Sequence, residues 1–138
     1  MNNFVLDPRL KADCIQLGDL ELSLVLLMNN ALVPWFILVP RVDENEIYLL
    51  SNEQQNTLYE EINILSKFVS DSFETDKLNI GAIGNIVNQL HVHIVGRRKD
   101  DVCWPGVVWG VKEKRPYSDA EIENIRTLAS SIMANRKK

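Results

Sequence analysis

Cysteine is scarce in this sequence: only Cys14 and Cys103 occur, and they lie far apart in the chain. They form no Cys-x-x-Cys pair, and a reducing, cytoplasmic environment is the simplest setting for such a chain. Long hydrophobic runs are also absent, because no stretch approaches the roughly 20 apolar residues that a membrane helix needs. The first residues lack the basic start and the apolar stretch of a signal peptide. We therefore expect a soluble cytoplasmic protein that has no membrane partner.

Glycine and proline are few, at 6 and 5 of 138 residues, and no linker, repeat or low-complexity tract interrupts the chain. The length suits one domain, 1–138, which can bury a core without disulfide or metal crosslinks. The net charge of −4 at pH 7 argues against broad binding to nucleic acids or anionic membranes. A small anionic ligand remains compatible with this net charge, since local main-chain donors and histidines can outweigh a mild overall negative charge.

Capping signals and hydrophobic spacing predict an α+β fold, mainly an antiparallel β-sheet flanked by helices. Asp7-Pro8 is typical of a helix start, and two capping boxes, Ser51-x-x-Gln54 and Ser118-x-x-Glu121, open longer amphipathic helices. The longer helices are expected at about 52–73 and 118–135. Strands are expected at 20–26, 35–39, 77–83 and 89–95. The first of these alternates leucine with other residues, which indicates one strongly apolar face.

Both histidines of the chain lie two residues apart in the last predicted strand. Successive side chains of a strand point to opposite faces, so Gln89, His91 and His93 share one face. The residues between them are aliphatic and belong in a core. Core packing gives no reason for an amide and two imidazoles in a row, so this row is the best candidate for chemistry.

Two neighbouring imidazoles suit phosphoryl chemistry. A neutral imidazole is a good nucleophile toward phosphorus, and an ordinary pKa near 6.5 keeps it largely neutral at cellular pH. One ring can attack while its neighbour holds the phosphate oxygens or the leaving group. The Gly84-Asn85 turn before the strand can bring main-chain N–H groups and an amide to the same phosphate. We expect Arg97, Arg98 and Lys99, which follow the row, to form a solvated strand end rather than a phosphate-binding group.

A His-x-His metal site is the main alternative at this row, because two imidazoles on one strand face can chelate zinc or copper. The chain has no third histidine, and its cysteines are not spaced as ligands. We therefore expect no metal and no other cofactor. Trp35 is expected in the core. The loop with Trp104 and Trp109 is expected either to close over the site or to fill a subunit interface.

The segment Gln89-Leu90-His91-Val92-His93-Ile94-Val95 resembles the His-φ-His-φ-His-φ-φ signature of the HIT, or histidine triad, superfamily of nucleotide hydrolases and transferases, where φ is hydrophobic. Leu38-Val39-Pro40 is similar to the family's strand that leads to the site. Trp104-Pro105-Gly106 and Trp109-Gly110 are similar to the tail of bacterial members. The resemblance covers roughly residues 10–110 and implies a HIT-like α+β domain. It also implies a homodimer, since family members commonly pair.

The resemblance implies a covalent mechanism without a metal. The family's middle histidine, here His91, attacks the α-phosphate of a nucleotide and forms a nucleotidyl-histidine that water hydrolyses. His93 then contacts the phosphate and assists the leaving group. The implied substrate is a purine nucleotide derivative, either a dinucleoside polyphosphate or a nucleoside phosphoramidate. The implied ribose and phosphate contacts are Asn30 (with Asn29 as the alternative), Asn79, Gly84 and Asn85.

Two positions depart from the family pattern. Gln89 stands at the first histidine and can hydrogen-bond but cannot titrate. If this position orients the nucleophile, activity survives; if it carries a proton, activity falls by about 10²–10⁴-fold. The chain also lacks the supporting histidine that many members carry after the Val-Pro strand end, and Asp43 is the hypothesised substitute. A nucleotide-binding module with little or no turnover is therefore the alternative function.

Overall fold

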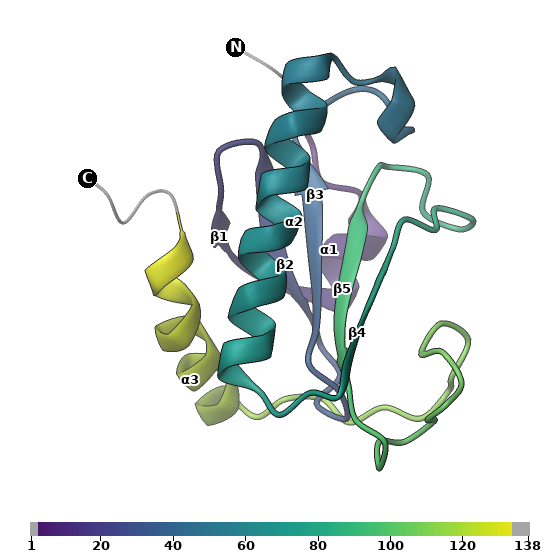
Figure 1. Ribbon diagram of the computed structural model, residues 1–138, viewed down its shortest axis with the longest axis vertical. Coiled ribbons are helices and arrows are strands. Elements are labelled where there is room, and N and C mark those ends of the chain that lie inside the picture. Colours follow the sequence, from purple (N-terminus) through teal and green to yellow (C-terminus); the bar gives the residue numbers. More distant parts are fainter. Residues whose placement is uncertain (1–2, 134–138) are drawn as a thin grey trace.

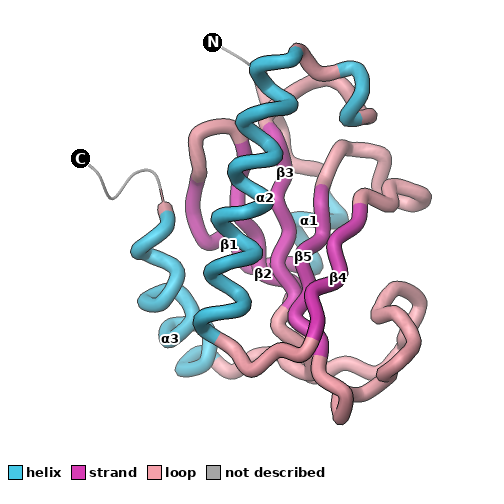
Figure 2. Tube along the Cα trace, viewed as in Figure 1, coloured by secondary structure: helices cyan, strands magenta, loops and turns pink. Residues whose placement is uncertain are grey.

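A computed structural model describes residues 3–133 of the chain, and within them five antiparallel strands form one sheet in the order β1-β2-β3-β5-β4. The strands are β1 (Cys14–Asp19), β2 (Ser23–Met28), β3 (Trp35–Pro40), β4 (Lys77–Gly81) and β5 (Val92–Arg97). The helices are α1 (Pro8–Asp13), α2 (Asn52–Ser72) and α3 (Asp119–Ala129), with 3-10 turns η1 (Ile47–Leu49) and η2 (Ser130–Ile132). Figure 1 shows α2 across one face of the sheet with α3 beside it, and α1 behind the sheet. The predicted α+β architecture is confirmed (Figure 2).

The helices begin at the predicted capping residues. The side chain of Asp7 accepts a hydrogen bond from the main chain of Arg9, and both capping boxes are present in full. Helix α2 ends within one residue of its predicted end. The prediction of one continuous C-terminal helix is wrong over residues 130–133, where a 3-10 turn replaces the α-helix, and residues 134 and 135 lie outside the described residues. The hydroxyls of Ser130 and Ser131 donate to carbonyls three residues back, which competes with regular helix hydrogen bonding.

The sequence pattern does not predict β1. Its ladder with β2 shifts register between Gln16 and Gly18, as at a β-bulge. A bulge disrupts the period-two alternation by which a strand is recognised in sequence. The strand is therefore visible only once its pairing with β2 is known.

Strand β2 begins at Ser23, three residues after its predicted start, and is buried on both faces. Val25 and Leu27 belong to the apolar cluster on the side of α2 and α3, whereas Leu26 belongs to the cluster on the other side. The prediction of a single apolar face is wrong, because helices and loops cover both sides of this antiparallel sheet.

The predicted strands 77–83 and 89–95 exist, but their ends differ. Strand β4 ends at Gly81, which pairs with His93. Strand β5 begins only at Val92, which is the last residue paired with β3, and it continues to Arg97. The segment with Gln89 and His91 therefore precedes the strand, because no neighbouring strand continues beside it.

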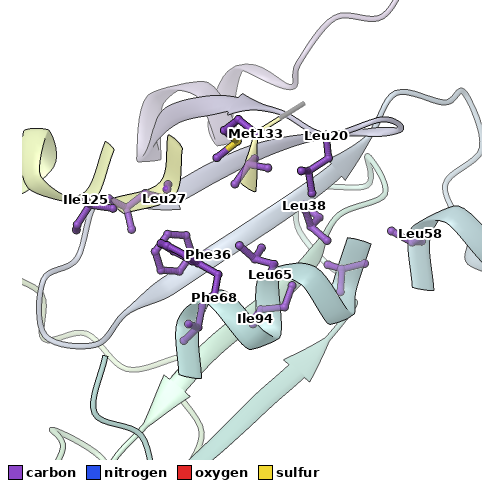
Figure 3. Packing of buried hydrophobic residues seen from close by; sticks show 14 of the residues in the cluster. Leu20, Leu27, Phe36, Leu38, Leu58, Leu65, Phe68, Ile94, Ile125 and Met133 are labelled. Atoms are coloured by element: carbon purple, nitrogen blue, oxygen red, sulfur yellow. The ribbon is translucent and has the colours of Figure 1, made fainter. Parts of the chain in front are cut away.

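The larger apolar cluster lies between the sheet and the two long helices (Figure 3). Phe68 of α2 meets Phe36 of β3 edge to face, with ring centroids 5.6 Å apart. Helix α2 and the turn that follows it approach closely at Gly96, where a Cβ would lie 3.0 Å from Val69 of the helix and 2.7 Å from Thr75 of the turn. Burying each leucine or phenylalanine here contributes about 1.5–3 kcal/mol. This cluster anchors β5, the strand that carries His93.

A second apolar cluster lies on the opposite face of the sheet. It is covered by the N-terminal segment, by Leu10 of α1 and by the loop that follows β5. Its fully or nearly buried members are Leu10, Leu26, Val33, Trp35, Ile37, Val39, Val95 and Val108. Ile37 pairs with His93 across the sheet, so the histidine row lies on this face.

Candidate active site

His91 immediately precedes β5, and the main chain of its own segment orients its ring. The Nδ1 atom lies 2.7 Å from the main-chain oxygen of Gln89. A carbonyl oxygen only accepts hydrogen bonds, so Nδ1 carries a proton, and in the neutral ring the lone pair is on Nε2. Only 6% of the residue is exposed. His91 is thus held in the tautomer in which Nε2 can act as a nucleophile.

His93 is the next residue on the same face, and the two imidazole centroids are 4.8 Å apart. The indole Nε1–H of Trp35 donates to Nδ1 of His93 at 3.0 Å. The ring of Trp109 meets His93 edge-on, with centroids 5.4 Å apart. Burial, with a smaller contribution from His91, lowers the pKa of His93 from 6.5 to about 4. His93 is therefore neutral at cellular pH, with its proton on Nε2.

Both imidazoles line a cavity of about 490 Å³ on this face of the sheet. Its walls come from α1, from the start of β3, from the 83–87 turn and from the 108–111 loop. A second hollow, of about 270 Å³, shares Ile83, Gly84 and His91 with the first. His91 therefore stands where the two hollows meet, and a bound molecule can extend to either side of it.

The Gly84-Asn85 turn lies in the cavity wall beside His91. Gly84 has a φ of 71°, in the left-handed region that favours glycine. The two predicted phosphate contacts in this turn and the two histidines are thus brought together by the fold.

The asparagines at 29, 30 and 79 do not line this cavity. The Oδ1 atom of Asn30 accepts from the main-chain N–H groups of Leu32 and Arg115, and that of Asn29 accepts from Tyr117. Asn29 and Asn30 line a neighbouring hollow that has Asp13, Met28, Trp35 and Val111 in common with the histidine cavity. The Oδ1 atom of Asn79, on β4, accepts from Arg97 at 2.8 Å.

The order of strands and the paired histidines match a known family. The model of the HIT domain matches residues 9–100 of this chain. The chain belongs to the HIT domain family.

Solved structures of bacterial HIT proteins share the whole fold. A histidine triad protein from Bradyrhizobium japonicum is 43% identical, with a TM-score of 0.90 over 94% of this chain and 98% of that one. One from Marinobacter aquaeolei is 42% identical, with a TM-score of 0.91 over 96% of this chain and 97% of that one. One from Sinorhizobium meliloti is 39% identical, with a TM-score of 0.91 over 95% and 98%. The comparison with curated proteins finds no match.

In this HIT protein the side chain of Gln89 contacts the N-terminal segment. Its Oε1 atom accepts from the main-chain N–H of Asp7 at 2.8 Å, and its Nε2 atom donates to the carbonyl of Val5 at 2.9 Å. The carbonyl of the same residue receives the Nδ1 proton of His91. The residue thus orients the neighbouring imidazole through its main chain, while its amide holds residues 5–7.

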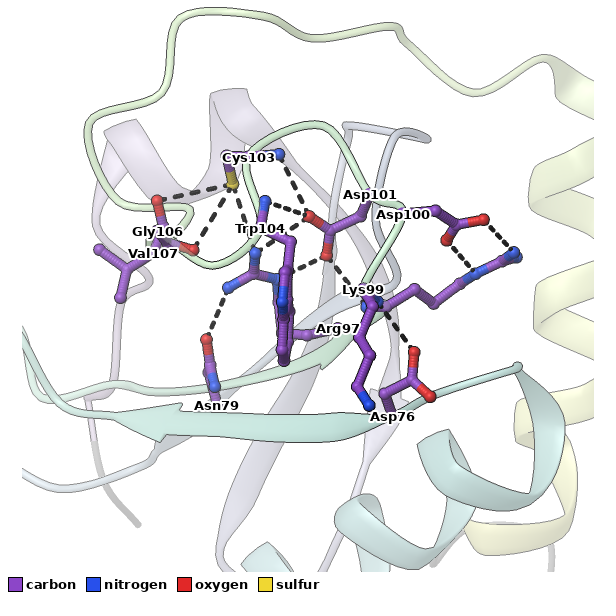
Figure 4. Close-up of polar contacts among 11 residues, drawn as sticks. Asp76, Asn79, Arg97, Lys99, Asp100, Asp101, Cys103, Trp104, Gly106 and Val107 are labelled. Carbon is purple, nitrogen blue, oxygen red and sulfur yellow. Dashed lines mark hydrogen bonds and ion pairs between the residues drawn. The ribbon is translucent and has the colours of Figure 1, made fainter.

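Arg97 is 1% exposed, so the prediction that it belongs to a solvated strand end is wrong. Its guanidinium contacts both carboxylate oxygens of Asp101, at 2.7 and 3.0 Å, and lies 5.5 Å from the ring centroid of Trp104 (Figure 4). The Asp101 carboxylate also accepts from three main-chain N–H groups of the loop. The buried ion pair therefore anchors the loop that carries Trp109, and Trp109 lines the histidine cavity.

Arg9 is a residue of the site that the sequence pattern does not reveal. It lies on α1, lines the histidine cavity and donates from Nη1 to the carbonyl of Ile86 at 3.0 Å. Nothing in the local sequence links α1 to the histidine row, since the two meet only in the folded chain. Asp43 lines a different hollow with Phe4 and Arg41, away from both histidines, so it does not replace the supporting histidine.

Two absences hold for the part of the chain that the structure describes. Across residues 3–133, no group of three or more histidine, cysteine, aspartate or glutamate side chains is arranged to hold a metal ion. No helix in the same range is long and apolar enough to span a lipid bilayer.

Proposed function

We propose that this HIT protein cleaves a nucleoside phosphate at its α-phosphorus through a covalent nucleotidyl-histidine on His91. The substrate would be a dinucleoside polyphosphate or a nucleoside phosphoramidate, and no cofactor takes part. Members of the superfamily are generally nucleotide-binding hydrolases and transferases. The observation that carries the proposal is the 2.7 Å contact between Nδ1 of His91 and the Gln89 carbonyl. It leaves the lone pair of Nε2 available beside a cavity large enough for a nucleotide.

The reaction has two displacement steps. The Nε2 lone pair of His91 forms a bond to the α-phosphorus while the bond from phosphorus to the leaving group breaks, and the leaving group takes the bonding electrons. A polyphosphate leaves as an anion, whereas the amine of a phosphoramidate also takes up a proton from water. Water then attacks the same phosphorus. The N–P bond breaks, its electrons return to Nε2 and the proton of the water passes to solvent. His93 donates a hydrogen bond from Nε2 to a phosphate oxygen during both steps.

The cavity offers distinct surfaces to the parts of a purine nucleotide. Apolar side chains in the cavity lining can cover a base; they are Met28, Trp35, Ile86, Val87, Val108 and Trp109. The main chain of the Gly84-Asn85 turn and the guanidinium of Arg9 are suited to phosphate oxygens. Asn30 and Asn79 could reach a nucleotide only after giving up their present contacts, so we assign the phosphate to the turn and to Arg9.

A homodimer in the cytoplasm is part of the proposal. Strand β4 lies at one edge of the sheet, and Ile80 on it is 48% exposed. An exposed edge strand with an apolar side chain is a surface on which a second copy can pair. The two free thiols, Cys14 and Cys103, support the cytoplasmic part of the proposal, because free cysteines are typical of reducing compartments.

The test is a labelling experiment with diadenosine tetraphosphate or adenosine 5′-phosphoramidate, radiolabelled at the α-phosphate. The reaction is stopped in denaturant without acid, because a phosphorus–nitrogen bond to histidine is acid-labile, and label on the protein is measured. Wild type, His91→Gly and His93→Asn are compared without added metal. We expect label on wild type with release of AMP, no label on His91→Gly, and slower labelling of His93→Asn, which keeps the nucleophile.

Nucleotide binding is measured in parallel from tryptophan fluorescence, since Trp35 and Trp109 line the cavity. Binding without label or AMP in wild type would make this protein a nucleotide-binding module instead. Label that persists in His91→Gly would place the nucleophile elsewhere. Zinc uptake that depends on both histidines, without nucleotide binding, would favour a metal site.

A further inference from the structure

We propose that Trp35 is a positioning residue that holds His93 as the neutral tautomer with its proton on Nε2, so that the site favours leaving groups that depart as anions. This inference rests on the proposed function and narrows its substrate class. A dinucleoside polyphosphate would then be a better substrate than a nucleoside phosphoramidate.

The geometry defines the direction of the hydrogen bond. Trp35 opens β3, and its indole Nε1 lies 3.0 Å from Nδ1 of His93, 58 positions later in the chain. An indole N–H can only donate, so Nδ1 must accept and the imidazole proton lies on Nε2. Trp109 contacts both rings of this pair. Its ring centroid lies 6.4 Å from that of Trp35 and 5.4 Å from that of His93. Trp35 is 9% exposed, and water has little access to compete for this bond.

A second proton on His93 would face the Trp35 N–H directly. An imidazolium has donors at both ring nitrogens, so Nδ1–H and the indole N–H would oppose each other in a buried site. Burial acts in the same direction and lowers the pKa of His93 to about 4. The charged or titratable groups around it are His91, which immediately precedes β5, and Arg9 and Asp13 of α1, which line the same cavity. The neighbours from β3, β4 and the 108–111 loop do not titrate: Trp35, Gly81 and Trp109.

A neutral imidazole that donates from Nε2 can hold a phosphate oxygen, but it is a very weak acid. When the P–O bond of a polyphosphate breaks, the leaving phosphate keeps the electron pair and departs as an anion without a proton. When the P–N bond of a phosphoramidate breaks, the amine must gain a proton, and His93 in this state does not supply one. The Trp35 hydrogen bond therefore discriminates between the two leaving groups through their need for a proton.

The tautomer is read directly by two-bond ¹H–¹⁵N correlation spectra of protein labelled at its two histidines. We expect the His93 signals of wild type to show a proton on Nε2 alone between about pH 5 and about pH 8. Trp35→Phe should give a mixture of tautomers and a higher pKa for His93. Trp109→Phe is the matched control, because it removes an indole that touches the same imidazole without donating to it. It should retain the wild-type tautomer.

Rates on diadenosine tetraphosphate and adenosine 5′-phosphoramidate give the second measurement. At about pH 6, Trp35→Phe should lower the ratio of kcat/KM for the polyphosphate to that for the phosphoramidate by up to about 10²-fold, the lower end of what a general acid contributes. Trp109→Phe alters a surface proposed for the base, which both substrates share, so it should change the two rates together and keep the wild-type ratio. A proton on Nδ1 in wild type, or the same ratio in wild type and Trp35→Phe, would overturn the inference. If neither substrate is cleaved, the proposed function fails, while the wild-type spectrum still decides the tautomer.

Discussion

The side-chain oxygen of Gln89 accepts a hydrogen bond from the main-chain N–H of Asp7 at 2.8 Å, although the two residues lie 82 positions apart. Together with the bond from the Gln89 amide to Val5, it fixes the N-terminal segment against the histidine row. The first position of the row thus has a structural use that an amide fulfils better than an imidazole. An amide carries its donor and its acceptor side by side on one carbon, whereas the two nitrogens of an imidazole point away from each other and both become donors when the ring is protonated.

Replacement of Gln89 is therefore expected to affect stability more than chemistry. Gln89→Ala removes one partly buried and one exposed hydrogen bond, each worth at most about 0.5–1.5 kcal/mol in unfolding free energy. It keeps the carbonyl that orients His91, so we expect the turnover rate to fall by less than about tenfold, below the range of general acid–base catalysis. Gln89→His should not raise the turnover rate. Urea unfolding measures the effect on stability, and steady-state kinetics measure the effect on turnover. A folded Gln89→Ala protein that turns over about 10²-fold more slowly than wild type would show that the amide takes part in the chemistry.

Arg9 is expected to bind substrate phosphate. Arg9→Gln removes a cation from the cavity wall and should weaken substrate binding by about 1.5–3 kcal/mol, the usual contribution of a charged hydrogen bond. The effect should appear in KM and should shrink as the salt concentration rises. Lys11→Gln is the control, since Lys11 is exposed on the same helix and does not line the cavity. Equal KM values for the two variants would argue against a phosphate contact.

Asp101 is expected to give stability that is lost in acid. The hydrogen bonds from Arg97 hold the pKa of this carboxyl well below its usual range. An acid whose pKa is depressed by folding stabilises the protein above its unfolded pKa, and this stability is lost as the pH falls below about 4. Asp101→Asn leaves Arg97 buried without its counter-ion and should cost about 3–5 kcal/mol at neutral pH.

Asp100 offers the matched comparison for this ion pair. Its carboxylate pairs with Arg98 at 2.8 Å, but 71% of its side chain is exposed. Exposed pairs contribute about 0–1 kcal/mol, so Asp100→Asn should change the unfolding free energy little. Urea unfolding at neutral and acid pH distinguishes the two variants, and similar losses in both would refute the special role of Asp101.

Glu61 is expected to have the opposite pH dependence. It lies in α2 with 2% of its surface exposed, and burial raises the pKa of its carboxyl. The folded protein then binds this proton more tightly than the unfolded chain, so stability decreases as the pH rises through the folded pKa. Glu61→Gln keeps an acceptor for the main-chain N–H of Leu22 and removes the buried charge. It should therefore be more stable than wild type at about pH 8 and vary less with pH in urea unfolding. Glu60→Gln, on the exposed side of α2, should follow wild type.

Local signals in the sequence were sufficient for the helices and for the position of the histidines. Ser51 and Ser118 mark helix starts because their capping partners lie three residues away, so the motif can be recognised in a short stretch of sequence. The aliphatic residues that alternate with Gln89 and the two histidines indicate a strand with one polar face, because this alternation is also a local pattern. The ends of β5 could not be found in this way, since they depend on where β3 and β4 stop.

The remaining parts of the site depend on long-range contacts. The sequence predicts Trp35 in the core, and it does belong to an apolar cluster. Its hydrogen bond to His93 cannot be predicted in this way, because it depends on the register in which β3 and β5 pair. Arg97 lies in a run of charges that is typical of solvent-exposed chain. The burial of Arg97 is explained only by the fold of the loop after β5, which places the Asp101 carboxylate against the guanidinium. An asparagine such as Asn79 is equally suited to a ligand and to a neighbouring side chain, and the sheet decides between them.

The sheet separates the two apolar clusters, and this separation has a consequence for ligand exchange. The cluster beneath α2 and α3 fixes the strands, whereas the N-terminal segment, α1 and the 101–111 loop cover only the opposite face. Local opening of this cover breaks contacts of the second cluster and leaves the first intact. We therefore expect the free energy that limits ligand exchange at the histidine cavity to be a local one, separate from that of global unfolding.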